Sequence, residues 1–200
     1  MGHPKKISYL LITVLMIFWA SSASAAEIVV GFSGPLSGPA AEYGQDCLNG
    51  IDMAIREINA TGGVMADGQK FTFRLEKMDD KASPELAVAN ARQLLEKEAL
   101  AIFDPVLSSA AALLKINEEE CGEFIVMGYT SSAQADHTKN NLLIVTAPVL
   151  TDYAKIYTNY AWGKGWRKAA MVVSLGAYGD EWRQSFKAAW EKRGGAITAD

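Results

Sequence analysis

The chain has 200 residues, of which 50% are hydrophobic and 21% are charged, and its formal net charge is −4. This is the composition of an ordinary globular protein, and the length leaves room for one full domain or for parts of two. The acidic balance and the absence of basic clusters argue against nucleic acid and anionic membrane surfaces as partners.

The N-terminus predicts a secretory signal peptide over residues 1–25. Lys5 and Lys6 precede an apolar run, and Ala23 and Ala25 form an Ala-x-Ala cleavage site. An uncleaved anchor is the alternative, but the apolar run is too short to cross a membrane comfortably. We expect cleavage after Ala25 and a soluble periplasmic protein, whose 17 basic and 23 acidic residues give a net charge of −6.

Cysteine and histidine are scarce in the mature chain. Cys47 and Cys121 are the only thiols. The elements described below place these residues at opposite rims of one domain, so we expect no disulfide, although export would permit one. His137 is the only histidine left after processing. The sequence therefore predicts no histidine-based metal site, and it indicates no cofactor.

Strands and helices alternate from residue 27 onward. Apolar and β-branched runs predict strands, and apolar residues at helical spacing predict the helices between them. The strands are expected at 27–32, 71–75, 99–103 and 124–127, and the helices at 44–59, at 84–95 and from Ser108 to about Glu120. Ser83 and Pro84 are an N-cap and a first helical residue. Such alternation predicts an α/β fold with a parallel sheet and helices on both faces.

A second α/β unit follows. Residues 142–149 are expected to form a strand and a crossing segment, followed by a helix capped by Thr151. Further strands are expected at 169–174 and 196–199, with a helix over 180–193 between them. About 50 residues are too few to bury a stable core by themselves. We therefore expect a first lobe over residues 26–146 and the truncated start of a second lobe over 147–200, in the N-terminal part of a longer protein.

The first strand runs into its helix through a loop rich in glycine, "VGFSGPLSGPAAEYG". A phosphate-binding P-loop needs a lysine after its glycines, and no lysine occurs between Gly31 and Gly50. The glycine spacing does not fit G-x-G-x-x-G either. Asp79 and Asp80 are the nearest acids that could hold a ribose, and neither is convincingly placed. The sequence disfavours a nucleotide site, while a tight turn without a ligand remains open.

Polar and aromatic side chains gather in the loops that follow the strands, where ligands bind in parallel sheets. Hydroxyl groups at a helix start favour an anion because unpaired backbone N–H groups and the helix dipole lie there. The alternatives are a simple N-cap for the serines and surface packing for the tyrosines. Together these side chains indicate a pocket for a small zwitterion or acid. They are Tyr43, Ser108, Ser109, Thr130, Ser131 and Tyr178.

Longer stretches resemble the leucine/isoleucine/valine-binding protein family, the type I periplasmic solute-binding components of ABC transporters. They are "VGFSGPLSGPAAEYGQDCLNGIDMAIREINATGGV", "KMDDKASPELAVANARQLL", "SSAAALLKINEEECGEFIVMGYTSSA" and "AYGDEWRQSFKAAWEKRGG". The resemblance covers almost all of the mature chain. It implies a type I periplasmic binding fold, with two Rossmann-like lobes that close over the ligand on a hinge.

The resemblance also implies a role for five residues. Ser108 matches the serine that binds the ligand carboxylate, and Thr130 matches the position whose carbonyl faces the ammonium group. Ser131 matches a residue that binds through hydroxyl and backbone. Tyr43 matches the aromatic residue that covers the ligand side chain, and Tyr178 matches the tyrosine of the second lobe.

The sequence departs from the family in three places. The first-lobe disulfide has no counterpart, since neither "MDDKASP" nor Leu107 supplies a cysteine. The acid that faces the ammonium group would lie beyond Asp200. Asp104-Pro105 replaces a small, uncharged stretch and is consistent with a different ligand. Other family members bind urea, amides, polyamine-like solutes or aromatic acids, and these remain alternatives.

The leading interpretation is a monomeric, non-enzymatic receptor that captures a branched-chain or related amino acid in the periplasm for an ABC permease. A second is a sensory module that reports the ligand to a membrane kinase or chemoreceptor, which needs further sequence after residue 200. A third is an enzyme, but the mature chain has no G-x-S-x-G elbow and no nucleophile beside a base. Asp79 and Asp80 fit turn formation better than catalysis.

Overall fold

The computed structural model describes residues 25–118, 123–132 and 140–200, so that most of the expected signal peptide lies outside the described residues. The strands are β1 Ala26–Gly34, β2 Val64–Ala66, β3 Gln69–Asp79, β4 Ala99–Asp104, β5 Ile125–Gly128, β6 Leu143–Val145, β7 Lys168–Ala170 and β8 Ala196–Ala199. The helices are α2 Ala41–Ala60, α3 Pro84–Glu96, α4 Leu107–Leu113, α5 Leu150–Gly163 and α6 Ala177–Glu191.

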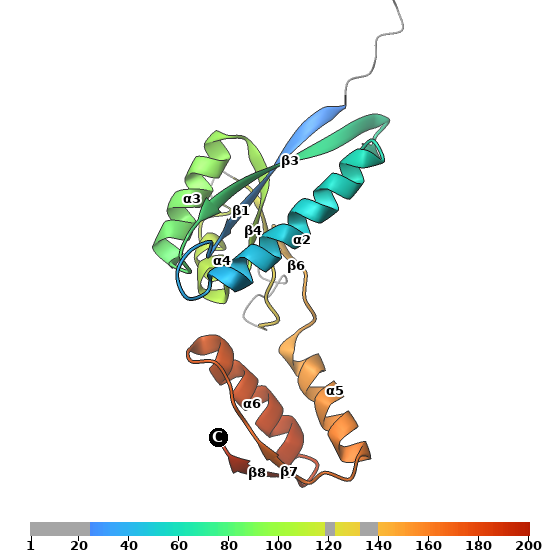
Figure 1. The fold of residues 1–200 in the computed structure, drawn as a ribbon, viewed down its shortest axis with the longest axis vertical. Coiled ribbons are helices and arrows are strands. Elements are labelled where there is room, and N and C mark those ends of the chain that lie inside the picture. Colours follow the sequence, from blue (N-terminus) through green and yellow to red (C-terminus); the bar gives the residue numbers. More distant parts are fainter. Residues whose placement is uncertain (1–24, 119–122, 133–139) are drawn as a thin grey trace, which may run out of the picture.

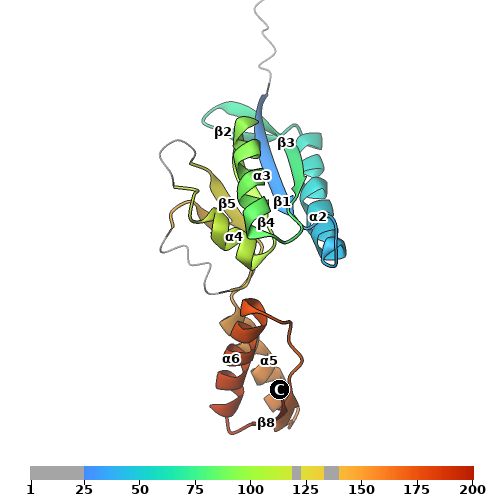
Figure 2. The ribbon, with the colours of Figure 1, turned by 90° about the vertical axis from the view of Figure 1, so that its left-hand side faces the viewer.

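These elements form one large and one small sheet (Figure 1). The large sheet has six strands in the order β2-β3-β1-β4-β5-β6, and the small sheet pairs β7 with β8. Strands β3, β1, β4, β5 and β6 run parallel, which confirms the predicted α/β fold. Figure 2 shows α2 on one side of the large sheet and α3 with α4 on the other.

A short hairpin at the edge of the sheet was not expected. Strand β2 pairs antiparallel with the start of β3. The turn between them is Asp67-Gly68, and both residues have positive φ, 48° and 76°. Asp-Gly between two strands is a strong hairpin signal, because both central positions of a type I′ turn require positive φ. This dipeptide could have revealed the hairpin.

The main core lies between the sheet and the helices α3 and α4. Small side chains on α3, Ala87 and Ala91, let the helix approach the sheet closely, and Leu94 fills the space beside them. The core residues are Val29, Ala87, Ala91, Leu94, Ala99, Ile102, Leu113, Phe124, Val126 and Leu143. Burial of this apolar surface is the main favourable term in the folding of this part.

The opposite face of the sheet is less completely covered. The side chain of Asn59 fixes the end of α2 to β3, since it bonds both the N–H and the C=O of Phe73, at 2.9 and 2.7 Å. An apolar hollow of about 800 Å³ lies along α2 and the sheet. Leu100 and Ile144 are 52% and 46% exposed. The described residues therefore leave part of this face open to water.

Of the five predicted helix starts, one is confirmed and four are wrong; α2, for example, begins at Ala41 instead of 44. Ser83 caps α3, because its hydroxyl accepts the Leu86 N–H. The helix expected from Ser108 to about residue 120 instead starts at Leu107, after Val106, and ends at Leu113. Thr151 does not cap α5, which starts at Leu150 without a side-chain cap. In both cases the first helical bond goes to an earlier backbone carbonyl: Ala110 N–H donates to Val106 O, and Tyr153 N–H donates to Val149 O.

The second part of the chain has shorter strands than expected. Strand β6 ends at Val145, three residues before Pro148, which lacks the N–H that a ladder requires. Strand β7 ends at Ala170, since its partner β8 has only four residues. Helix α6 begins at Ala177 instead of 180. Its Trp190 is 1% exposed and stacks on Phe186, so that aromatic side chains form the core here.

Two glycines of α2 provide a test of the fold. A Cβ on Gly44 would fall on the carbonyl oxygen of Pro35, whereas a Cβ on Gly50 would meet nothing within 4 Å. Both substitutions by alanine improve helix propensity by about 1 kcal/mol. We expect Gly50→Ala to stabilise the protein slightly and Gly44→Ala to destabilise it by about 1–3 kcal/mol, because the loop must move. Urea unfolding of both variants measures this, and equal stability would contradict the packing described.

Candidate functional site

The loops at the carboxyl ends of β1, β3 and β4 are tied together by side chains. The Asp79 carboxylate accepts the Leu36 N–H at 2.8 Å and the Ser37 hydroxyl at 2.5 Å. Although burial alone would raise its pKa, these hydrogen bonds and that from the Lys81 N–H lower the pKa of Asp79. The hydrogen-bond donors of the glycine-rich loop thus bind the Asp79 carboxylate of the same chain. This agrees with the absence of a nucleotide-binding motif in the loop.

Tyr43 lies in the first turn of α2, and the loop position expected for it is wrong. Its hydroxyl donates to the Pro105 carbonyl at 3.1 Å, which ties α2 to the loop between β4 and α4. Burial raises the pKa of Tyr43 far above its usual range, so that this phenol keeps its proton. The ring itself is 44% exposed and can contact a ligand.

The two serines of the next loop have different environments. Ser108 is exposed in the first turn of α4, where helical N–H groups lack intrahelical partners. Ser109 is fully buried, and its hydroxyl has no hydrogen-bond partner among the described residues. Of this pair, only Ser108 can reach a solute without rearrangement.

The loop after β5 carries three buried hydroxyl residues, Thr130, Ser131 and Ser132. The Thr130 hydroxyl accepts the Ser132 N–H at 3.3 Å. The Ser131 hydroxyl lies 3.0 Å from the hydroxyl of Tyr178, and the Ser132 hydroxyl donates to Glu181. This loop is therefore where the two parts of the chain meet.

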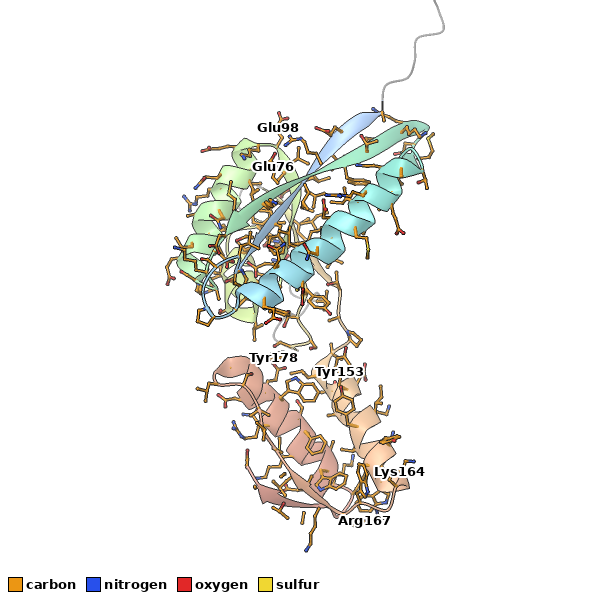
Figure 3. All side chains as sticks on the ribbon, in the orientation of Figure 1. Glu76, Glu98, Tyr153, Lys164, Arg167 and Tyr178 are labelled. Carbon is orange, nitrogen blue, oxygen red and sulfur yellow. The ribbon has the colours of Figure 1, made fainter. Side chains whose placement is uncertain are left out.

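The second part contributes the start of α6 to this junction. Tyr178 lies within the first turn of the helix, which corrects the expected loop position. The next residue must be glycine, since a Cβ on Gly179 would fall on the carbonyl oxygen of Ser174. Figure 3 shows Tyr178 and Tyr153 at the end of this unit that faces the large sheet, while Lys164 and Arg167 lie at its far end.

Aromatic rings support this end of the second part. Tyr157 stacks on Trp182 with centroids 5.8 Å apart, and Tyr153 lies 6.0 Å from each of these rings. The three residues join α5 to α6. Such contacts fix the start of α6 relative to α5.

The structure brings some of the expected residues together and leaves others apart. Ser131 meets Tyr178, and Tyr43 contacts the loop that carries Ser108. Within the described residues, no hydrogen bond joins Ser108 to Ser131 or to Tyr178. The sequence interpretation missed Glu181, which lies one turn after Tyr178 on α6. The i, i+3 spacing could have revealed it, had Tyr178 been placed in the helix.

The described residues offer little for metal or redox chemistry. Within residues 25–118, 123–132 and 140–200, no group of three or more His, Cys, Asp or Glu side chains could hold a metal ion. Cys47 is a free thiol, while Cys121 and His137 lie outside the described residues, so their expected roles stay predictions. None of the described helices combines the length and apolar character needed to span a membrane.

Comparison with known proteins identifies the family to which the chain belongs. A model of the periplasmic binding protein family matches residues 27–200. A Leu/Ile/Val-binding protein of Rhizobium johnstonii is 30% identical over 167 residues, which are 82% of this chain and 44% of that protein. The chain thus spans about half the length of the curated relatives it matches.

Solved structures share the fold. An extracellular ligand-binding receptor from Verminephrobacter eiseniae has a TM-score of 0.73 at 22% identity and covers 88% of this chain and 49% of its own. A solute-binding protein of an ABC transporter from Rhodopseudomonas palustris, solved with 3,4-dihydroxybenzoic acid, has a TM-score of 0.70 at 22% identity, covering 86% and 46%. The expected type I periplasmic binding fold is confirmed, and the chain belongs to the periplasmic binding protein family.

Proposed function

We propose that this protein is a non-enzymatic receptor that captures a small solute with a carboxylate, first of all a branched-chain or related amino acid, for an ABC permease. The observation that carries the proposal is the meeting of Ser131, in the loop after β5, with Tyr178, in the first turn of α6, at 3.0 Å. Both were expected to face the ligand. The similarity to a Leu/Ile/Val-binding protein supports the solute class.

In this proposal neutral donors hold the carboxylate. Ser108 offers an exposed hydroxyl and the first-turn N–H groups of α4, and Ser109 lies beside it. Thr130 and Ser131 supply further backbone and hydroxyl groups. Such donors are effective when the site is closed to water, because fixed dipoles act strongly at low dielectric. Tyr43 covers the rest of the solute from α2.

We further propose that residues 26–146 and 147–200 belong to two lobes that move on a hinge. The described hydrogen bonds between them are few and centre on Ser131 and Ser132. Interfaces this small permit relative motion of the two units. The receptor is proposed to act as a monomer. On closure, a bound solute would replace the contact between Ser131 and Tyr178 and would bridge the same two units.

An aromatic acid is the second candidate solute. Three tyrosines, Tyr43, Tyr129 and Tyr178, lie around the loops in question, and Tyr43 and Tyr129 are 44% and 50% exposed. The receptor from Rhodopseudomonas palustris, of similar fold, was solved with 3,4-dihydroxybenzoic acid. Exposed phenol rings suit an aromatic face better than a branched aliphatic chain.

The solute class can be tested by ligand-induced stabilisation. A ligand at 100 times its Kd stabilises the native state by about 2.7 kcal/mol. We expect the full-length protein to melt at a higher temperature with L-leucine or L-valine, and with 3,4-dihydroxybenzoate if the aromatic candidate is right. Calorimetric titration then gives the affinity. A protein that none of these solutes stabilises would argue against both candidates.

The proposed site residues can be tested by hydroxyl removal. We expect the double variant Ser108→Ala, Ser131→Ala to lose at least about 100-fold in affinity for whichever solute binds, since each hydrogen bond to a charged group contributes about 1.5–3 kcal/mol. Thr61→Ala is the control, because Thr61 lies past the far end of α2 and bonds only locally to Ile58. Unchanged affinity in the double variant would place the site elsewhere.

Export can be tested directly. We propose that residues 1–25 direct the chain to the periplasm and are then removed. Expression in a Gram-negative host followed by N-terminal sequencing of the periplasmic fraction should give Ala26 as the first residue. Recovery of an unprocessed chain with the membranes would favour the anchor instead.

A further inference from the structure

A cluster of buried polar side chains lies directly beneath the loops of the proposed site. It joins β1, the loop after β3, α3 and the end of β4. None of its members is more than 8% exposed. The members are Ser33, Asp80, Asn90 and Asp104.

Each carboxyl group in the cluster holds a loop by accepting a backbone hydrogen bond. Asp80 accepts the Ala82 N–H at 2.8 Å, and Asp104 accepts the Val106 N–H at 2.9 Å. Asp80 also accepts the Ser33 hydroxyl at 3.1 Å, and Asn90 donates to that hydroxyl at 3.3 Å. Asp104 thereby shapes the turn that leads into α4 and Ser108.

No ion pair to Asp80 or Asp104 occurs among residues 25–118, 123–132 and 140–200. The ion pairs of the described residues all involve other carboxylates. From β1 the pair faces the Ser33 hydroxyl, from α3 the Asn90 amide and from β3 the like charge of Asp79. Helix α4 contains no charged residue. Two ionised carboxylates here would be buried, adjacent and uncompensated, which is strongly unfavourable.

The carboxyl oxygen Asp104 Oδ2 indicates how the repulsion between the two buried acids is relieved. Asp104 Oδ2 is buried and has no hydrogen-bond partner among the described groups. Asp80 bonds to Ser33, which directly follows Phe32, and Asp104 directly follows Phe103, the partner of Phe32 in the β1–β4 ladder. The two acids are therefore neighbours, and each affects the pKa of the other. Two carboxylates cannot bond, but a protonated carboxyl is a donor to a carboxylate. A single proton on Asp104 would satisfy the orphan oxygen and remove one of the two charges.

We propose that Asp104 is a neutral acid that donates its proton to Asp80, and that this shared proton positions the β4–α4 loop that presents Ser108. The role in presenting Ser108 rests on the proposed function, whereas the shared proton does not. Asp104 is then a positioning residue, which acts on the solute through Ser108. The charge of the pair is −1 instead of −2 beneath a loop that is to receive an anion.

The direction of the pKa shifts of Asp80 and Asp104 determines whether stability rises or falls with pH. Burial and the adjacent Asp80 raise the pKa of Asp104 well above its usual range, and burial also raises the pKa of Asp80. The native state therefore binds a proton that the unfolded chain releases at lower pH. Stability from the shared proton is fully present at acid pH and is lost as pH rises through the raised pKa.

The first experiment measures unfolding by urea between about pH 5 and about pH 9. For the wild type, the unfolding equilibrium constant should rise with pH, by up to about tenfold per pH unit for one proton. Asp104→Asn keeps a donor for Asp80 and cannot ionise, so its curve should lack this component. Parallel curves for the two proteins would overturn the shared proton.

Asp79→Asn is the matched control, with the same substitution on the neighbouring carboxylate. Hydrogen bonds lower the pKa of Asp79. Its removal should therefore destabilise the protein at neutral pH, and the difference should shrink as pH falls, which is the opposite sign. If Asp104→Asn fails to fold, infrared spectroscopy of the wild type at neutral pH decides: a protonated carboxylic acid band supports the proposal, and its absence overturns it.

The second experiment separates the shared proton from its role at the site. The affinity of the intact protein for L-leucine or 3,4-dihydroxybenzoate, whichever stabilises it, is measured over the same pH range. We expect the wild type to lose affinity as pH rises and Asp104→Asn to keep it. Identical pH profiles, with the stability curves as predicted, would overturn the positioning role alone. Failure of all solutes to bind would overturn the proposed function and that positioning role, and would leave the shared proton decided by stability.

Discussion

Parallel pairing of β1 between β3 and β4 is the constraint on which the rest of the structure depends. Because these strands point the same way, their carboxyl ends meet at one edge, and the loops after them become neighbours. Residues 33–43, 79–83 and 104–109 are thereby brought together although far apart in the chain. The polar contacts among these three loops follow from this alignment, and the parallel pairing of β5 with β4 adds the loop of Thr130 and Ser131 to the same edge.

Acidic side chains stabilise that edge from within. Asp79 holds the glycine-rich loop through Leu36 and Ser37, and it does so as a charged group near the surface. Asp80 and Asp104 hold the next two loops from a fully buried position, where charge is costly. Environment thus divides three acids into two kinds: one that hydrogen bonds keep ionised, and a pair whose burial favours a retained proton.

The second part of the chain depends on different forces. Its core is aromatic, with Trp190 buried against Phe186, and its small sheet has only two strands. The link to the first part consists of hydrogen bonds from Ser131 and Ser132 to α6 and of a backbone bond from Leu150. A small polar junction of this kind permits the relative motion of two units that the proposed function requires.

The sequence alone determined the α/β architecture, the order of the elements apart from β2, and the Ser83 cap, because these depend on local periodicity and on side-chain chemistry at a helix start. It also singled out Ser131 and Tyr178, through the family resemblance, before any contact between them was known. Element ends needed the structure itself: the first residue of α5, Leu150, donates to the distant Ser131 carbonyl, and α4 begins after Val106, whose N–H donates to the Asp104 carboxyl group. Only the fold could show that Asp80 and Asp104, 24 positions apart, lie together, and that neither forms an ion pair within the part of the chain that the structure describes. Burial and proximity across a sheet depend on how strands pair, and no local pattern in the sequence records that.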